Sequence, residues 1–141
     1  MNKIIIRTTL WLAALIVSSG SVFSVEKIDI GQREYRENCL NCHGEVGDGN
    51  GSYAQLLNTR ASDLTQLAKT NKGVFPFARI YEVIDGRLVI KGHGERDMPI
   101  WGRVYRIKAG ETYFDMDYNP EYYVRGRILA LIEYISRLQK E

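Results

Sequence analysis

A five-residue run, Cys39-Leu40-Asn41-Cys42-His43, restricts the fold of this chain more than any other feature of its sequence. The sequence has two cysteines and two histidines, and three of these four residues fall within the run. The C-x-x-C-H spacing is the haem c attachment pattern, in which two cysteine sulfurs bond one porphyrin. With the pair at the end of a helix, both sulfurs reach the vinyl groups of the same ring and the adjacent histidine faces the iron. Under this interpretation, the chain folds around a large flat cofactor.

Three other interpretations of Cys39 and Cys42 compete with haem attachment. A disulfide between them would suit an oxidising compartment, but it would close a very small loop and stabilise the chain little. A thioredoxin-type redox motif needs a βαβ context, whereas this sequence indicates helices and loops. A zinc site would need a fourth ligand besides Cys39, Cys42 and His43, and only His93 is left to supply it. The spacing favours haem attachment over all three.

An iron held by His43 needs either a second axial ligand or an open site on its other face. His93, Met98 and Met116 are the candidates for that ligand. The sequence favours Met98, and the two other residues and an open site are the alternatives.

The residues around Met98 explain this preference. Pro99 follows directly and stiffens an extended loop, so the thioether can be held against a metal without a helix to carry it. Trp101 offers a large flat surface for the wall of a cofactor pocket. In the competing interpretation, Met98 and Trp101 are ordinary core residues, which is the commoner role of a lone methionine.

The first 24 residues differ from the rest of the chain. Two basic residues precede an apolar run from Leu10 to Val17, small residues follow, and no acidic residue occurs. This layout predicts a secretory signal peptide at 1–24, cleaved after Ser24, and one exported, periplasmic domain at 25–141. An uncleaved membrane anchor is the alternative, but a spanning helix needs about 20 apolar residues. We therefore expect no stable membrane span after cleavage.

Charge excludes one class of partner. Removal of residues 1–24 takes away Lys3 and Arg7 and no acidic side chain, which leaves a formally neutral chain. A nucleic-acid-binding domain normally carries a basic excess. We therefore expect no nucleic-acid partner.

Hydrophobic periodicity and capping residues predict an all-α domain. Each predicted helix has a local start signal, and two of them also have a stop signal or a regular apolar face. The predicted segments are a helix over Asp29–Leu40 with Asp29 as N-cap, a glycine-rich loop over Gly44–Ser52, a short helix over Ser62–Lys69 capped by Ser62, a helix from Pro76 that Gly86 stops, and a last helix that Asn119 and Pro120 start.

Two features fit this pattern less well. Short alternating runs at Leu88–Lys91 and Val104–Lys108 indicate two possible strands. Gly126 lies inside the last predicted helix, where it costs about 1 kcal/mol relative to alanine. We expect another backbone to pass close to Gly126, because such an approach would explain the glycine.

With these residues in place, the chain resembles the class I cytochrome c family, particularly its small bacterial members. The resemblance covers nearly all of the chain after residue 24. The attachment run from Cys39 to His43 is its most specific part. The stretches Gly44–Gly51, Ala61–Thr65 and His93–Gly102 are also similar to segments of those proteins, and the last of them resembles their distal-ligand loop.

The resemblance implies a cytochrome c fold, with three to five helices wrapped around one covalently attached haem c. It also implies that the first and last helices cross through a glycine and an aromatic residue on one and a leucine and an aromatic residue on the other. Gly31 and Tyr35 match the first pair, and Leu131 and Tyr134 match the second. A close crossing would explain why a glycine is tolerated within the first helix.

Two departures from the family pattern change what we expect. Many relatives carry a proline whose carbonyl accepts a hydrogen bond from the proximal imidazole, and Ser52 stands at that place here. A serine carbonyl can accept the same bond. The connection from Gly102 to Tyr118 is longer than in the smallest members, and we expect it either to cover a haem edge or to serve a partner.

The sequence therefore predicts a mono-haem electron carrier, not an enzyme. Cys39 and Cys42 would attach the haem, and His43 and Met98 would ligate its iron. Its redox partners would be a dehydrogenase, a cytochrome bc complex or a terminal oxidase. The alternatives are a gas-binding sensor in which Met98 is displaced, and a small peroxidase that uses His93. The predicted pocket residues are Leu56, Leu57, Leu64, Phe77, Ile80, Ile84, Ile100 and Trp101, with Arg60 or Arg79 paired to a haem propionate.

Overall fold

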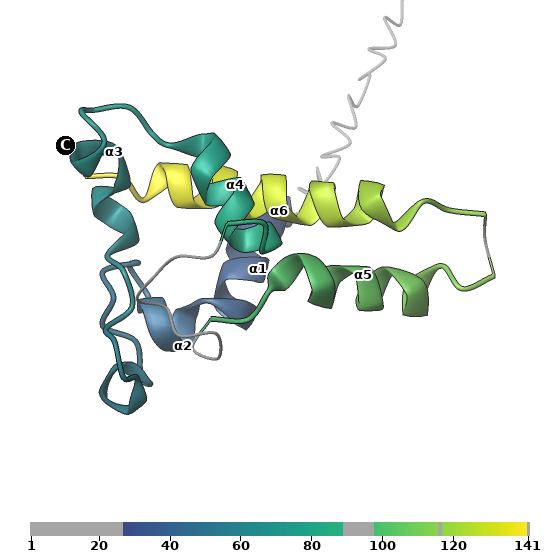
Figure 1. The fold of residues 1–141 in the computed structure, drawn as a ribbon, viewed down its shortest axis with the longest axis horizontal. Coiled ribbons are helices and arrows are strands. Elements are labelled where there is room, and N and C mark those ends of the chain that lie inside the picture. Colours follow the sequence, from purple (N-terminus) through teal and green to yellow (C-terminus); the bar gives the residue numbers. More distant parts are fainter. Residues whose placement is uncertain (1–26, 89–97, 116, 141) are drawn as a thin grey trace, which may run out of the picture.

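The computed structural model of the protein describes residues 27–88, 98–115 and 117–140. These residues form helices and loops, and no strand occurs among them, which confirms the all-α prediction (Figure 1). The helices are α1 (Ile30–Asn38), α2 (Leu40–His43), α3 (Leu67–Thr70), α4 (Phe77–Asp85), α5 (Trp101–Thr112) and α6 (Pro120–Arg137), with 3-10 turns at Ala54–Leu56 and Leu64–Gln66. Within the described ranges, none of these helices has both the length and the apolarity to cross a membrane.

Several predictions fall on residues that the structure does not describe. They are the signal peptide at 1–24, the ligand alternatives His93 and Met116, and most of the possible strand at Leu88–Lys91.

The predicted starts of three helices are confirmed. The Asp29 carboxylate accepts a hydrogen bond from the Gln32 N–H at the start of α1, and the Asn119 side chain accepts one from the Glu121 N–H at the start of α6. Pro76 is the N-cap of α4, and Gly86 ends that helix in the left-handed conformation at φ 88°. These ends are set by local chemistry that can be identified in the sequence.

Two of the local predictions are wrong. Asp63, not Ser62, caps the next helical segment, which is divided into a 3-10 turn and the single turn α3. Val104–Lys108 belongs to α5 and forms no strand. Its apparent alternation is too short to distinguish strand from helix, and packing decides because Tyr105 and Ala109 are buried at helical spacing.

With α5 helical and the attachment run in its own turn α2, six α-helices occur in the described residues rather than three to five.

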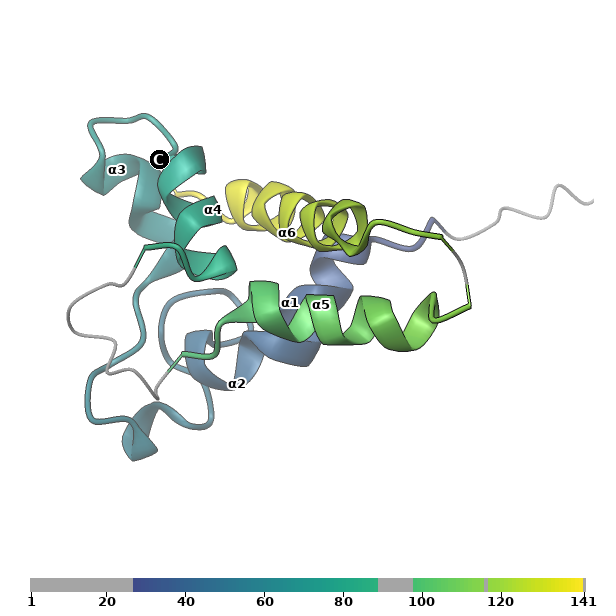
Figure 2. The same cartoon turned by 45° about the vertical axis from the view of Figure 1, so that its right-hand side comes forward.

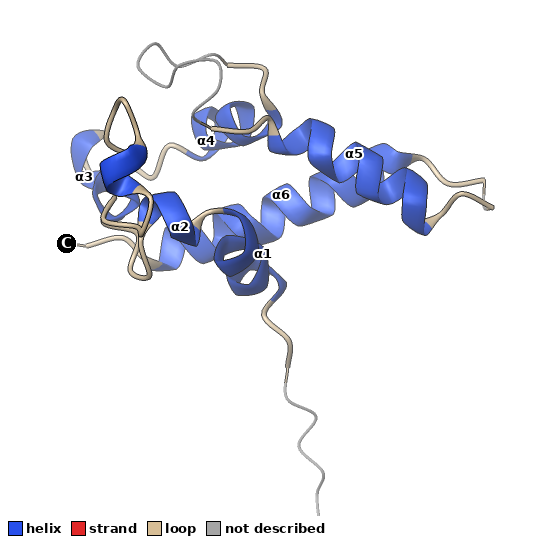
Figure 3. Cartoon of the chain, turned by 90° about the horizontal axis from the view of Figure 1, so that it is seen from below, coloured by secondary structure: helices blue, strands red, loops and turns tan. Residues whose placement is uncertain are grey.

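The predicted crossing of the first and last helices is confirmed (Figure 3). A Cβ added to Gly31 would overlap the Ala130 carbonyl oxygen and would lie 2.9 Å from Tyr134 Cβ, so the missing side chain lets the two backbones meet. The rings of Tyr35 and Tyr134 lie 5.1 Å apart between centroids, and Leu131 is fully buried. This crossing packs α6 directly against α1.

The segment from Gly102 to Tyr118 forms most of α5 and the turn to α6. The two helices run side by side as a hairpin that extends away from α3 and α4 (Figures 1 and 2). At the turn, the rings of Tyr113 and Tyr118 lie 4.3 Å apart between centroids. The turn between the two helices therefore lies away from the attachment run. Trp101 at the start of α5 and Leu131 and Ile135 of α6 line the cavity described below, whereas no described residue of the segment 102–118 does.

The close backbone approach that we expected at Gly126 is absent. A Cβ added there would meet no described atom within 4 Å, and the residue is exposed on α6. Gly126→Ala should therefore raise the free energy of unfolding by about 0.5–1 kcal/mol, because alanine is the better helix former. Urea denaturation followed by circular dichroism measures this, with Gly110→Ala in α5 as a second open site. A loss of stability at Gly126 would contradict the prediction.

Candidate functional site

The attachment run lies where α1 changes direction. Cys39 is the C-cap of α1, and its N–H donates to the Tyr35 carbonyl 2.8 Å away. Residues Leu40–His43 then form the single turn α2, in which the His43 N–H donates to the Cys39 carbonyl, also at 2.8 Å. This turn brings both cysteines and the histidine to one end of α1. Cys39 is buried at 7% exposure, and Cys42 is half-buried.

The imidazole of His43 is oriented by a backbone carbonyl. Its Nδ1 lies 2.9 Å from the Ser62 carbonyl oxygen. Because a carbonyl only accepts hydrogen bonds, Nδ1 carries the proton, and the lone pair of the neutral ring lies on Nε2. An imidazole held in this way is oriented as a metal ligand.

The predicted partner of the imidazole, the carbonyl of Ser52, is therefore wrong. Next to Ser52, the Tyr53 N–H donates to the Asn41 carbonyl at 2.8 Å, and the Ser52 hydroxyl lies 3.4 Å from the Asn41 side chain. These contacts hold this part of the loop against α2. No side-chain pattern in the sequence marks the Ser62 carbonyl as the acceptor, because the bond is made by the backbone.

The glycine-rich loop is fastened to the turn that carries the histidine. The Tyr35 hydroxyl donates to the Gly44 carbonyl at 2.6 Å, and the Gly49 N–H donates to the His43 carbonyl at 2.8 Å. Gly44 and Gly49 have positive φ angles, which other residues rarely adopt. The loop thus returns past His43 and brings Ser62 to the imidazole.

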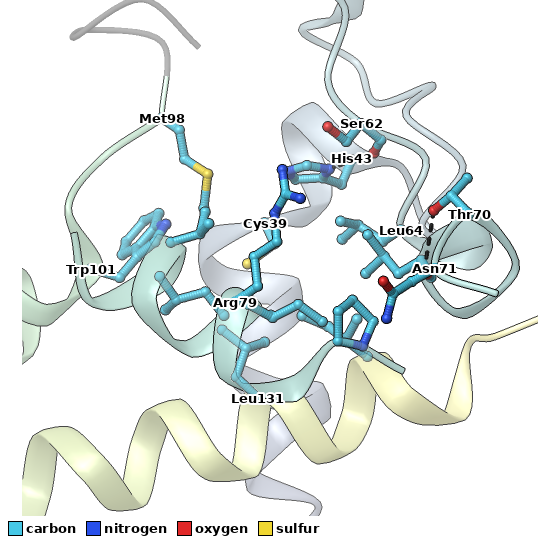
Figure 4. A pocket seen from close by; sticks show the side chains of 16 residues that line it. Cys39, His43, Ser62, Leu64, Thr70, Asn71, Arg79, Met98, Trp101 and Leu131 are labelled. Atoms are coloured by element: carbon cyan, nitrogen blue, oxygen red, sulfur yellow. Dashed lines mark hydrogen bonds between the residues drawn. The ribbon is translucent and has the colours of Figure 1, made fainter. Parts of the chain in front are cut away.

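A cavity of about 360 Å³ opens beside Cys39 and His43, and Met98 and Trp101 line the same cavity (Figure 4). The structure therefore brings three predicted site residues, Cys39, His43 and Met98, together. In the view of Figure 4, Met98 and Trp101 lie on one side, Thr70 and Asn71 on the other, and Cys39 and His43 between them. The volume is within the range of small-molecule and cofactor sites. Cys42 lines a second, small cavity that shares Cys39, His43, Met98 and Trp101 with the first.

The predicted apolar lining is confirmed in part. Leu64, Ile80, Ile84 and Trp101 line the main cavity, and Leu57 lines the small one. Leu56, Phe77 and Ile100 line neither and are 78%, 48% and 52% exposed. The residues that the prediction missed are Leu67, Pro76, Val83, Leu131 and Ile135.

Of the two arginines considered, Arg79 lines the main cavity. Arg60 instead donates to the Asn50 side chain, 2.5 Å away. Arg79 is therefore the cation that can pair with an acidic group of a molecule in this cavity.

The cavity wall formed by Leu64–Thr70 is held by the end of the chain. The Gln139 side chain accepts from the Ala68 N–H at 2.9 Å and donates to the Leu64 carbonyl at 2.7 Å. The Lys140 N–H donates to the Thr65 carbonyl at 2.9 Å. These bonds connect distant parts of the sequence, and periodicity gives no sign of them.

Behind Cys39 lies a buried ion pair that the sequence did not reveal. Glu34 is 3% exposed and accepts a hydrogen bond from Arg127 Nη1 at 2.6 Å and one from Asn38 Nδ2 at 3.0 Å. Arg127 also lies over the Tyr123 ring, 4.8 Å from its centroid. The carboxylate is thus paired although it is removed from water.

The chemistry of the cysteines bears on the alternatives to haem attachment. Burial, which has the largest effect, together with the charge of Glu34 and the neighbouring Cys42 raises the pKa of the Cys39 thiol to about 12. A redox-active or zinc-binding cysteine needs an accessible thiolate, which such an environment opposes. The two thiols form no disulfide, no βαβ unit occurs in the described residues, and these residues contain no group of three metal donors.

Comparison of the chain with known protein families, with curated proteins and with solved structures finds no match.

Proposed function

We propose that this chain is an exported mono-haem c-type cytochrome that carries single electrons between redox partners. One observation carries the proposal: Cys39, His43 and Met98 line one apolar cavity, Cys42 lines the small cavity next to it, and the His43 imidazole is oriented with its lone pair on Nε2. A reactive dithiol would not need a thioether and a histidine at the same cavity, whereas an iron porphyrin can take both as ligands.

Each site residue has a separate task in this proposal. Cys39 and Cys42 would hold the cofactor permanently through thioether bonds, and His43 and Met98 would ligate its iron. The bound haem supplies an iron that accepts and returns one electron. Ser62 keeps the imidazole in the ligating tautomer and increases its basicity. Because both ligands stay bound in either oxidation state, little of the protein has to rearrange.

The environment of the site favours the reduced state. A Met/His ligand pair raises the reduction potential of the iron relative to a pair of histidines. An apolar cavity acts in the same direction, because it disfavours the extra positive charge of the oxidised iron. Leu64, Ile80 and Ile84 supply this apolar surface. Arg79 is placed to pair with a carboxylate of the cofactor.

The proposal extends to location and partners. The signal peptide at 1–24 would direct the chain to the periplasm, where a dehydrogenase, a cytochrome bc complex or a terminal oxidase would exchange electrons with it.

The test is a spectrum of the purified, exported protein. We expect a low-spin haem whose oxidised form shows the weak sulfur-to-iron charge-transfer band. Met98→Ala should abolish that band and leave the haem covalently attached, because the cysteines are unchanged. Mass spectrometry of the parent should show one added haem and loss of residues 1–24.

The same spectrum separates the alternatives. High-spin iron at neutral pH in the parent would contradict electron transfer through a six-coordinate iron and would favour a ligand-binding or peroxidase function. Met98→Leu is the matched control, since it keeps the apolar volume and removes the ligating sulfur. If Met98→Leu retained the band, Met98 would not be the ligand.

A further inference from the structure

One buried carboxyl group takes no part in the cofactor site. Asp85 is the last residue of α4, and its side chain is 2% exposed. Its Oδ2 forms an ion pair with Arg87 Nε, whereas Oδ1 lies 3.7 Å from Arg106 Nη2. Within the described part of the chain, Oδ1 has no hydrogen-bond partner. Burial of an incompletely paired charge is costly, so its position calls for a physical reason.

The carboxylate of Asp85 lies against the first turn of α5. A Cβ added to Gly102 would overlap Asp85 Oδ1 and would lie 2.7 Å from the Asp85 carbonyl oxygen, so only glycine permits this contact. The N-cap residue, Ile100, provides no side-chain acceptor for the first N–H groups of α5. A negative charge beside that turn is stabilising because it faces the positive end of the helix dipole. The end of α4 therefore supplies the negative group that α5 lacks.

A second contact fastens the residue before α5. Gly86 adopts a φ of +88°, and a Cβ there would overlap Ile100 Cγ2 and lie 3.2 Å from Ile100 Cβ. Only Pro99 stands between Ile100 and Met98, and its ring fixes the backbone φ angle. The docking of Asp85 and Gly86 on residues 100–102 therefore determines where Met98 enters the cavity.

The same ion pairs connect this junction to α6. Arg106 Nε lies 2.6 Å from Glu121 Oε1 in addition to its contact with Asp85. Arg87 and Arg106 thus share Asp85 as an anionic partner. Loss of the Asp85 charge would leave two guanidinium groups close together with one carboxylate fewer.

We propose that Asp85 is a positioning residue for the distal ligand: its carboxylate holds the start of α5 and thereby keeps the Met98 thioether at the iron. This inference rests on the proposed function, because it requires that Met98 ligate a haem iron.

The test is a titration of the oxidised protein with imidazole, which competes with Met98 for the iron. Binding of imidazole is measured by the loss of the sulfur-to-iron band. Asp85→Asn preserves size and removes the charge, and we expect it to raise the apparent affinity for imidazole at least tenfold. Asp29→Asn is the matched control, since it removes a helix-capping carboxylate that pairs with Arg137 at the far end of α6. We expect this control to lower the unfolding midpoint and to leave imidazole affinity within twofold of the parent.

A second variant keeps the proposal testable if Asp85→Asn does not fold. Gly102→Ala places a methyl group where Asp85 Oδ1 now lies, and it should also raise imidazole affinity at least tenfold. The positioning role of Asp85 would be overturned if the folded variants bound imidazole with the affinity of the parent. It would also be overturned if Asp29→Asn raised the imidazole affinity as much as they do. A coloured parent without the band would overturn ligation by Met98 and this inference with it. If the parent shows the band and Asp85→Asn has the same imidazole affinity as the parent, this inference is overturned and the proposed function is not.

Discussion

Replacement of Gly31 by alanine is expected to destabilise the protein by about 2 kcal/mol or more, although alanine is the better helix former. The gain in helix propensity is about 1 kcal/mol. The added Cβ would overlap the Ala130 carbonyl oxygen and lie 2.8 Å from the Ala130 carbonyl carbon, so the two helix backbones would have to separate. Overpacking costs about 1–3 kcal/mol and sometimes more, and we expect the upper end of that range or more here because backbone atoms cannot rotate away. The steric cost therefore exceeds the gain in propensity.

Such a loss is a large part of the whole stability of a domain, which is about 5–15 kcal/mol. Urea denaturation of the parent, Gly31→Ala and Gly126→Ala measures it, because both positions are helical glycines and only the first lies at a crossing. We expect the free energy of unfolding to fall in Gly31→Ala and to rise in Gly126→Ala. Two variants that are both more stable than the parent would show that α1 and α6 do not approach each other as closely as the structure places them.

The predicted helices were those whose ends carry local signals. Asp29 at the start of α1, Gly86 at the end of α4 and Asn119 at the start of α6 act through bonds within a few residues, so the sequence alone identifies them. Helix α5 was missed because its N-cap, Ile100, makes no side-chain bond. Its helical state depends on the packing of Tyr105 in the core shared with α6 and on the contact of Gly102 with Asp85 of α4, which join distant parts of the chain.

The residues of the candidate site also fall into two groups, those with a local signal in the sequence and those placed by contacts between distant segments. Cys39, Cys42 and His43 were identified because their chemistry requires a fixed spacing along the chain. The Ser62 carbonyl was not identified, because a backbone acceptor has no side-chain signature and its partner lies 19 residues away. The wall residues Leu131 and Ile135 lie four residues apart in α6, a spacing that indicates one apolar face, but only the folded structure shows that this face reaches the cavity.

Removal of both cysteines is expected to have the largest effect on the cofactor. In the Cys39→Ala/Cys42→Ala double variant no sulfur is left to form a thioether, so we expect less than a hundredth of the parental covalently bound haem. Each single variant retains one attachment point and should retain covalent haem at reduced yield. Cys39→Ala should be the less stable of the two, because Cys39 is buried in the core and Cys42 is only half-buried. The measurement is mass spectrometry after extraction with acidified organic solvent, which removes haem that is not covalently bound.

The control for the double variant is Ile135→Ala, which enlarges the cavity without changing the attachment chemistry. Ile135 lines the cavity and is 3% exposed, so truncation should cost about 2–5 kcal/mol of stability. Its haem should nevertheless stay covalently bound, because destabilisation does not break a thioether bond. If the double variant kept covalent haem, another residue would be the attachment point. If the exported parent were colourless with two thiols or a disulfide at Cys39 and Cys42, the cavity would serve a different ligand and the cytochrome proposal would be wrong.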